Sequence, residues 1–365
     1  MTPVSSRHPK AQPVRTDDYG YSNARIRGMR SRLLGRDKIE RFLRADDLKA
    51  VLQELMHSEY SDDLEEVLIH GRGAAEIDEG LRNNVVRTYT KIRGFLNEEA
   101  YDICNTLLGR WDNFNLKTIL RGKNLHLSSG EIQAALMPVG ALGQSEIDGL
   151  LSCSDSRDVV NMAVTWGLPH AAALRRGFAA YQRTGSLVDL ELPLDRHFTH
   201  WASAQLSKRG ENYRLARWVL GTQVDNLNLV IVFRAARESL QPDQSAEYFL
   251  LGGRDIDLEK YQRLAIMSDT DEILDELRST RYGPVLDEAV VRYLETMSLA
   301  VFERALEDHF TRRVLALGTR DPLGVGIPIS YLWAKHNEVT NLRIIVKGKS
   351  VGLPVDRMRR ELILV

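Results

Sequence analysis

The sequence has little cysteine, almost no net charge and no long hydrophobic run. Its two cysteines, Cys104 and Cys153, form no C-x-x-C pair, which favours a reducing cytosolic compartment over a disulfide framework. The net charge of −1 provides no overall attraction to nucleic acid or to an anionic membrane. No uncharged run reaches the roughly 18 residues that cross a bilayer, and no signal-peptide core is visible. We therefore expect no transmembrane segment and no binding to nucleic acid.

The motifs of the common catalytic sites are also missing. The sequence contains no G-x-G-x-x-G, H-E-x-x-H or G-x-S-x-G, and the glycine-rich residues 251–254 lack the G-K-[ST] that holds a phosphate and Mg²⁺. Asp195, His197 and His200 form a short cluster, but the position of His200 is arginine in the other copies of the repeat described next. Because arginine is not a zinc ligand, we predict no metal site, no catalytic residue and no cofactor.

What the sequence does contain is a threefold internal repeat. The stretch WDNFNLKTILRGK at residues 111–123 places an acid, an asparagine and a basic residue at fixed spacing, and the pattern returns twice at equal intervals along the chain. The three copies are Asp112, Asn115 and Arg121; Asp225, Asn228 and Arg234; and Glu338, Asn341 and Lys347. A fixed period of this kind is the signature of a repeat architecture.

Each copy of the motif is expected to be an amphipathic helix. At about 100° per residue, the acid, the asparagine and the leucine that follows it share one face, so the helix would bury two polar groups. Unpaired, each would cost roughly 1–3 kcal/mol, so we expect hydrogen-bonded partners. Two interpretations are open: the polar layer is part of a working surface, or it fixes the helix register, which is the commoner role. The basic residue, on the opposite face, would complement the helix terminus or face a central cavity.

Further landmarks repeat at nearly the same interval and extend the helical pattern over the chain. Helix starts of the N-cap type recur at Asp47, Asp155 and Asp269. Apolar residues mostly follow a 3.6-residue period, and period-two alternation is rare. We therefore predict an all-α protein of three similar helical domains, at residues 18–130, 131–243 and 244–365, after a disordered tail at residues 1–17. We hypothesise that the extra C-terminal helix packs against the first domain and favours a closed array.

The N-terminal part is rich in basic residues. Residues 1–44 contain eleven lysines and arginines against four acids. An RNA-binding role is possible for such a segment, but no aromatic stacking pattern accompanies it. We therefore favour a solvated or partner-facing helix, with Arg25 and Arg27 as candidate partner contacts.

The opening YGYSNARIRGM at residues 19–29, the three repeated helices and the ending at residues 331–363 resemble one family. It is the C subunit of the prokaryotic V-type (archaeal A-type) ATPase/synthase, related to the d subunit of the eukaryotic vacuolar enzyme. The most specific part is the third motif, W-x-K-x-x-E-x-x-N-L-R-x-I, which begins at Trp333. The second repeat departs from the pattern, since Val230 replaces a basic residue and Ala235-Ala236 replace Gly-Lys.

The resemblance implies a noncatalytic, funnel-shaped subunit of three helical domains in pseudo-threefold arrangement around a hollow. Such a subunit sits on the cytoplasmic side of the proteolipid ring, peripheral to the inner face of the cell membrane. It receives the central shaft and so couples ring rotation to shaft rotation during ATP synthesis or hydrolysis and the transport of protons or sodium ions. The implied partners are the proteolipid ring and the shaft subunits. Contacts are expected near Arg25 and Arg27 or near the helix ends at Arg121, Arg234 and Lys347.

Three other interpretations compete with this one. A free-standing α-helical adaptor would remain soluble in cell extracts. An enzyme built on the polar layers would need a ligand-sized pocket with perturbed ionisable groups at one motif. An RNA-binding protein would show binding that depends steeply on salt.

Overall fold

The computed structural model describes residues 19–69, 71–267 and 269–365, and over these residues the chain forms twenty α-helices and no strand. The predicted all-α class is therefore confirmed. The predicted disordered tail at residues 1–17 lies outside the described residues. Among the helices described, none is both long and apolar enough to cross a bilayer.

The period of the sequence is also the period of the helices. The repeated motifs lie on the long helices α6 (Glu98–Asn124), α12 (Glu211–Arg237) and α19 (Gly326–Ser350), whose last residues are equally spaced along the chain. The helices before them start at the same interval, namely α5 (Ala74–Arg93), α11 (Leu187–Gln205) and α17 (Ala300–Leu315). The same holds for the short helices that follow, α7 (Ser129–Ala135), α13 (Pro242–Ala246) and α20 (Val355–Glu361).

Three shorter helices complete each repeat. They are α2 (Arg36–Arg44), α3 (Leu48–Leu55) and α4 (Ser61–Val67); α8 (Gln144–Ser152), α9 (Ser156–Thr165) and α10 (Ala171–Thr184); and α14 (Leu258–Ala265), α15 (Thr270–Leu277) and α16 (Gly283–Thr296). The predicted N-caps are confirmed, because the carboxylates of Asp47, Asp155 and Asp269 accept backbone N–H bonds in the first turns of α3, α9 and α15. Of the helices in the described residues, only α1 (Gly20–Arg30) and α18 (Leu317–Arg320) lie outside the pattern.

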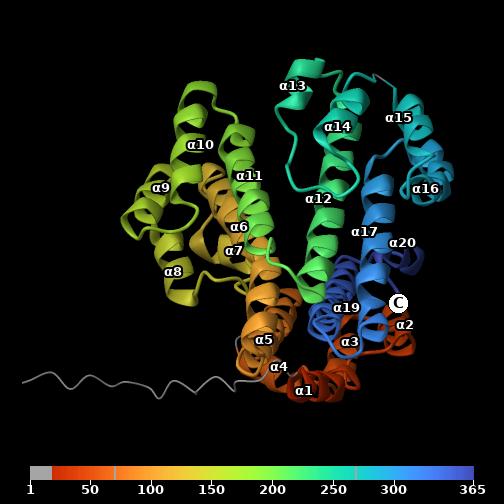
Figure 1. Ribbon diagram of the computed structural model, residues 1–365. Helices are drawn as coiled ribbons and strands as arrows, with labels where there is room; N and C mark the ends of the chain where they lie inside the picture. Colours follow the sequence, from red (N-terminus) through yellow and green to blue (C-terminus); the bar gives the residue numbers. More distant parts are fainter. Residues whose placement is uncertain (1–18, 70, 268) are drawn as a thin grey trace, which may run out of the picture.

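Each motif helix packs against helices of the next repeat along the chain. Helix α6 packs on α11, α12 on α17, and α19 on α5 of the first repeat. The buried apolar side chains form three clusters that follow this pairing: one spans residues 116–194, one spans residues 229–306, and one joins both ends of the chain. Figure 1 shows the corresponding groups of helices, with α8–α11 at the left, α12–α17 at the upper right and α1–α5 at the bottom.

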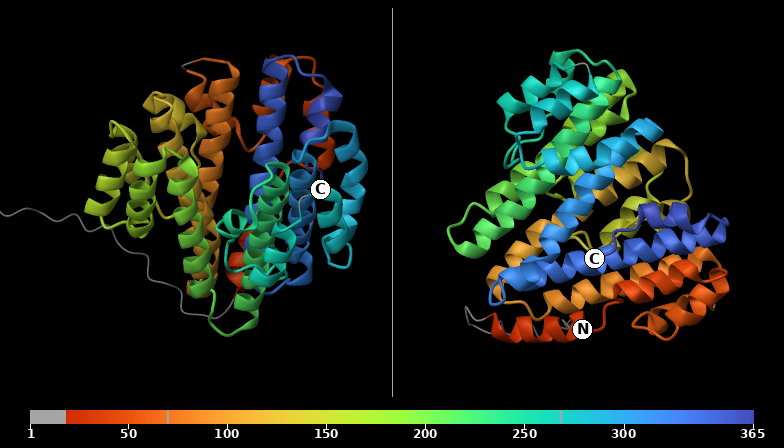
Figure 2. Two further views of the ribbon diagram at one scale, coloured as in Figure 1. Left: turned by 90° about the horizontal axis from the view of Figure 1, so that it is seen from above. Right: turned by 90° about the vertical axis from the view of Figure 1, so that its right-hand side faces the viewer.

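The two ends of the chain lie side by side. The right-hand view of Figure 2 shows the blue C-terminal helices next to the red and orange N-terminal ones. Helix α20 packs on α2, where the Arg359 guanidinium pairs with Glu40, and the Lys349 ammonium donates to the carbonyl of Ala45. The hypothesis that the C-terminal helix packs against the first repeat is therefore confirmed. The divisions predicted near residues 130 and 243 stay a prediction.

Candidate functional site: a repeated polar layer and a basic cleft

The motif asparagines pair with the backbone as another peptide group would. Asn115 donates to the carbonyl of Met137 at 2.9 Å and accepts from its N–H at 2.8 Å. Asn228 does the same with Leu250, at 2.9 Å in both directions. Asn341 pairs likewise with Ile363, at 2.9 and 3.1 Å. In every copy the partner lies 22 positions further along the chain, so each motif helix holds the segment that follows it.

The motif acids bind the backbone just before the next helix begins. Asp112 accepts from the N–H groups of Ala141 and Leu142 at 2.7 and 3.0 Å, directly before α8. Asp225 accepts from three successive N–H groups, at residues 254–256, and from the hydroxyl of Tyr282 at 2.8 Å. Both carboxylates are 3% exposed or less. These hydrogen bonds offset part of the cost of burying the charge, and burial still raises the pKa of both carboxylates.

The third acid makes the equivalent contact with the other end of the chain. Glu338 accepts from the N–H of Leu34, directly before α2, and from the Tyr60 hydroxyl at 2.5 Å. The buried Lys335 ammonium lies 3.0 Å from the same carboxylate and 2.8 Å from the Tyr60 oxygen. Burial and the neighbouring Glu338 raise the pKa of Tyr60 well above its usual value. The same layer therefore joins the last repeat to the first.

In all six side chains of this layer, both polar atoms are engaged. Each of the six binds at least one backbone group in a segment outside the helices. Such a backbone group has no hydrogen-bond partner within a helix of its own. These contacts are what the register-fixing interpretation requires. Whether the layer also serves a partner stays a prediction.

The basic residues of the motif lie on the surface and pair with the helix opposite. Arg121 binds Glu191 of α11, and Arg234 binds Glu303 of α17, with both guanidiniums more than half exposed. In the third copy Lys347 is exposed, and the equivalent acid, Asp78 of α5, binds Arg343 instead. None of the three predicted basic residues lines the cleft described below.

The two N-terminal arginines hold α1 to the body of the protein. Arg25 is exposed, but its guanidinium lies 4.4 Å from the centroid of the Phe95 ring and donates to the Tyr21 hydroxyl at 2.7 Å. Arg27 donates to the carbonyl of Pro322 at 2.7 Å. Their predicted contact with a partner protein stays a prediction.

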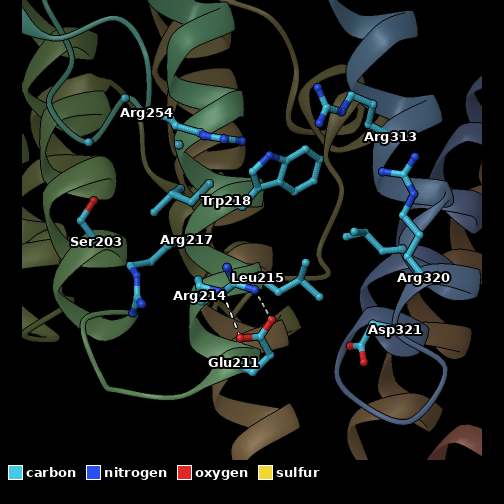
Figure 3. Close-up of a pocket in the computed structure, with 15 residues that line it drawn as sticks. Ser203, Glu211, Arg214, Leu215, Arg217, Trp218, Arg254, Arg313, Arg320 and Asp321 are labelled. Carbon is cyan, nitrogen blue, oxygen red and sulfur yellow. Dashed lines mark hydrogen bonds and ion pairs between the residues drawn. The ribbon is translucent and has the colours of Figure 1, made fainter.

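A second candidate site, which the sequence did not reveal, is a basic cleft of about 710 Å³ between α12 and the end of α17 with α18. Figure 3 shows arginines on both walls of it. They are Arg214, Arg217, Arg254, Arg313 and Arg320. The arginines come from three separate stretches of the chain, and in none of them is the local sequence unusual, so no local signal could have identified the cleft.

The two acids of this basic cleft are already engaged. Glu211 pairs with Arg214, its Oε2 lying 3.0 Å from the arginine Nε (Figure 3). Asp321 accepts from the N–H groups of Gly324 and Gly326 at 3.1 and 2.7 Å. The cleft therefore carries an excess of positive charge that its own acids do not neutralise.

Arg217 donates to the backbone carbonyls of Leu206 and Lys208, and three further guanidiniums in the basic cleft have weak anionic partners or none. Arg254 lies 3.9 Å from Asp255, and that carboxylate is closer to Arg281, at 2.7 Å. Arg313 lies over the ring of Trp218, 5.1 Å from its centroid. Arg320 is exposed and pairs with no carboxylate among the described residues. Burial, together with the neighbouring arginines, lowers the pKa of Arg313. Such an arrangement favours binding of an anionic group.

Comparison with known proteins points to one family along the whole chain. The family model described as ATP synthase (C/AC39) subunit matches residues 22–361. The chain is 30% identical to the C subunit of the V-type ATP synthase of Deinococcus radiodurans, over 98% of the chain and 94% of that protein. It is 29% identical to the C subunit of the A-type ATP synthase of Methanothermobacter thermautotrophicus, over 94% of the chain and 87% of the relative. It is 26% identical to the C subunit of the A-type ATP synthase of Methanocaldococcus jannaschii, over 94% of the chain and 86% of that protein.

Proposed function

Because the chain belongs to the ATP synthase (C/AC39) subunit family, whose members are structural, noncatalytic subunits of a rotary ATPase, we propose that it is the socket of the central stalk. In this role it lies on the cytoplasmic face of the membrane, between the proteolipid ring and the rotor shaft. It transmits rotation from one to the other during proton or sodium transport. Its three helical repeats, at residues 18–130, 131–243 and 244–365, would surround the end of the shaft.

The observation that supports this proposal best is the connection of the last repeat to the first. Transmission of torque needs a stiff body with two interfaces and no reactive group. A linear array of repeats is held only by contacts between neighbours, so its ends are free to twist. Here the contact of Glu338 with Leu34 and that of Arg359 with Glu40 tie the two ends together. An applied torque would then be distributed over all three repeats.

The test is an affinity pull-down of the tagged full-length chain from gently solubilised membranes, with the recovered proteins identified by mass spectrometry. The proposal expects a small proteolipid together with the shaft and nucleotide-binding subunits. The rotary enzyme is assayed for ATP hydrolysis in the same sample to show that it is intact. If only soluble proteins are recovered from an intact sample, the socket role is wrong, and a helical adaptor becomes the better description.

A further inference from the structure

We propose that the basic cleft between α12 and α17–α18 receives a carboxylate-rich segment of the shaft protein. The proposal rests on the socket role and adds the place and the chemistry of contact. The cleft presents its guanidiniums from opposite walls, so a segment lying between them would meet positive charge on both sides (Figure 3). Each guanidinium can bind a carboxylate through two parallel hydrogen bonds.

The first argument is the charge that the fold leaves without a partner. Arg254, Arg313 and Arg320 line the same cleft, and its two acids are already bound, Glu211 by Arg214 and Asp321 by backbone N–H groups. Burial lowers the pKa of Arg313, and the positive charges of Arg281 outside the cleft and of Arg254 and Arg320 inside it lower it further, so like charges already repel one another here. Carboxylates of a partner would remove the repulsion on binding, which makes an acidic segment the complementary occupant.

The second argument comes from the equivalent cleft in another repeat. The cleft between α19 and α5 has Tyr331 at the repeat position that Trp218 occupies in the basic cleft. It also contains basic residues, and both of its arginines and Lys335 pair with acids of the protein. Arg32 pairs with Glu59 at 3.3 Å, and Arg87 pairs with Asp63 at 2.6 Å. The unpaired arginines of the basic cleft are therefore not a requirement of the repeated fold.

The third argument concerns the size and the lining of the basic cleft. At about 710 Å³ it is far larger than a single phosphate or sulfate ion. Its walls also carry apolar side chains, namely Leu215, Trp218 and Leu317. Arginine and tryptophan beside aliphatic groups are typical of the centre of a protein interface. A protein segment can use the apolar and the basic parts together, which an inorganic anion cannot.

The experiment compares two double charge reversals that change the net charge equally. The first, Arg313→Glu with Arg320→Glu, lies in the basic cleft. The control, Arg157→Glu with Arg183→Glu, changes exposed arginines on α9 and α10. Binding of each full-length variant to the purified shaft protein is measured by biolayer interferometry at several salt concentrations. Circular dichroism shows whether each variant is folded. The single variant Arg320→Glu is measured as well, because it changes only an exposed side chain.

The cleft variant is expected to bind the shaft roughly tenfold or more weakly and with a smaller dependence on salt, because charged contacts at an interface are screened by ions. The control is expected to stay within about twofold of the parent protein. Arg320→Glu alone should give an intermediate loss. Equal affinity of the folded cleft variant and the parent would overturn the proposal.

A photo-crosslink identifies the occupant directly. A benzoylphenylalanine at Leu215, inside the basic cleft, is expected to cross-link to a peptide of the shaft protein that contains several Asp or Glu residues. A cross-link to the proteolipid would overturn the proposal, as would a cross-link to a shaft peptide without acids. The pull-down from solubilised membranes separates the two proposals. If the parent protein and the cleft variant recover the ring and the shaft equally well, only the inference about the cleft is wrong. If the parent recovers neither, the socket role itself is wrong.

Discussion

The polar layer predicts a specific loss of stability in Asn228→Ala. The side chain is fully buried and makes two hydrogen bonds of 2.9 Å with the backbone of Leu250, which is itself 2% exposed. Alanine would leave one N–H and one C=O without a partner in the core. Each such group costs roughly 1–3 kcal/mol, and partial relaxation offsets some of this. We expect the free energy of unfolding to fall by about 2–4 kcal/mol.

Two measurements check this loss of stability. Calorimetry should show a melting temperature lowered by roughly 3–5 °C for a chain of 365 residues that melts as one unit. Amide hydrogen exchange should be faster in the segment around Leu250, whose N–H loses its acceptor. Asn161→Ala is the control, because Asn161 is an exposed asparagine on α9, and its replacement should change stability by no more than about 0.5 kcal/mol.

The result that refutes the reasoning is an Asn228→Ala protein with unchanged melting and unchanged exchange near Leu250. The two buried backbone groups would then have found other partners, and the layer would not fix the packing register. If rotation were also uncoupled from ATP hydrolysis in that variant, the interpretation of the layer as a working surface would be the better one.

Three other perturbations have defined outcomes. A methyl group at Gly140 would overlap the Asp112 carboxylate, so Gly140→Ala should cost about 3 kcal/mol in a denaturant titration, the worth of the displaced hydrogen bonds. Lys335→Met leaves the buried Glu338 without its cation and should cost roughly 3–5 kcal/mol by the same titration. Burial and two neighbouring arginines lower the pKa of His336 to about 3. Since the unfolded imidazole takes up a proton near pH 6.5 and the folded one does not, stability should fall as the pH drops below about 6.5. His336→Gln should lessen this fall in melting temperature between about pH 7.5 and pH 5.

Each of these perturbations has a control within the chain. Gly28→Ala in α1 meets no atom within 4 Å and should stabilise the protein by about 0.5–1 kcal/mol, so a similar gain at Gly140 would contradict the overlap. Adding Glu338→Gln to Lys335→Met should recover part of the loss, because the uncompensated charge is removed. An equal pH profile for His336→Gln and the parent would show that another group titrates.

The sequence was sufficient for the features that depend on local signals. Helix periodicity, the N-caps at Asp47 and Asp155 and the equal spacing of the motifs all reflect contacts within a few residues or an exact repetition. The burial of Asp112 and Asn115 also followed from the helical face on which they lie. Each of these expectations needed no knowledge of which elements meet in space.

The partners of the polar layer could not be predicted in the same way. The acids bind backbone N–H groups, and every residue except proline carries one, so the sequence has no pattern that marks them. One signal was present: Gly140 and Gly253 follow Asp112 and Asp225 at the same spacing, and at each glycine a side chain would collide with that carboxylate. The ion pair of Arg121 with Glu191 depends on which helices pack together, which the repeat alone does not decide.

The contact between Glu338 and Leu34 has a consequence for synthesis of the protein. The two residues are 304 positions apart. At about 5–20 residues per second, a ribosome needs roughly 15–60 s to make the chain between them. During that time Leu43, Val51 and the other apolar residues of the first helices lack α19, against which they pack in the finished protein. The core that is translated first is therefore completed last, and the apolar faces of the nascent N-terminal helices stay uncovered by α19 until then.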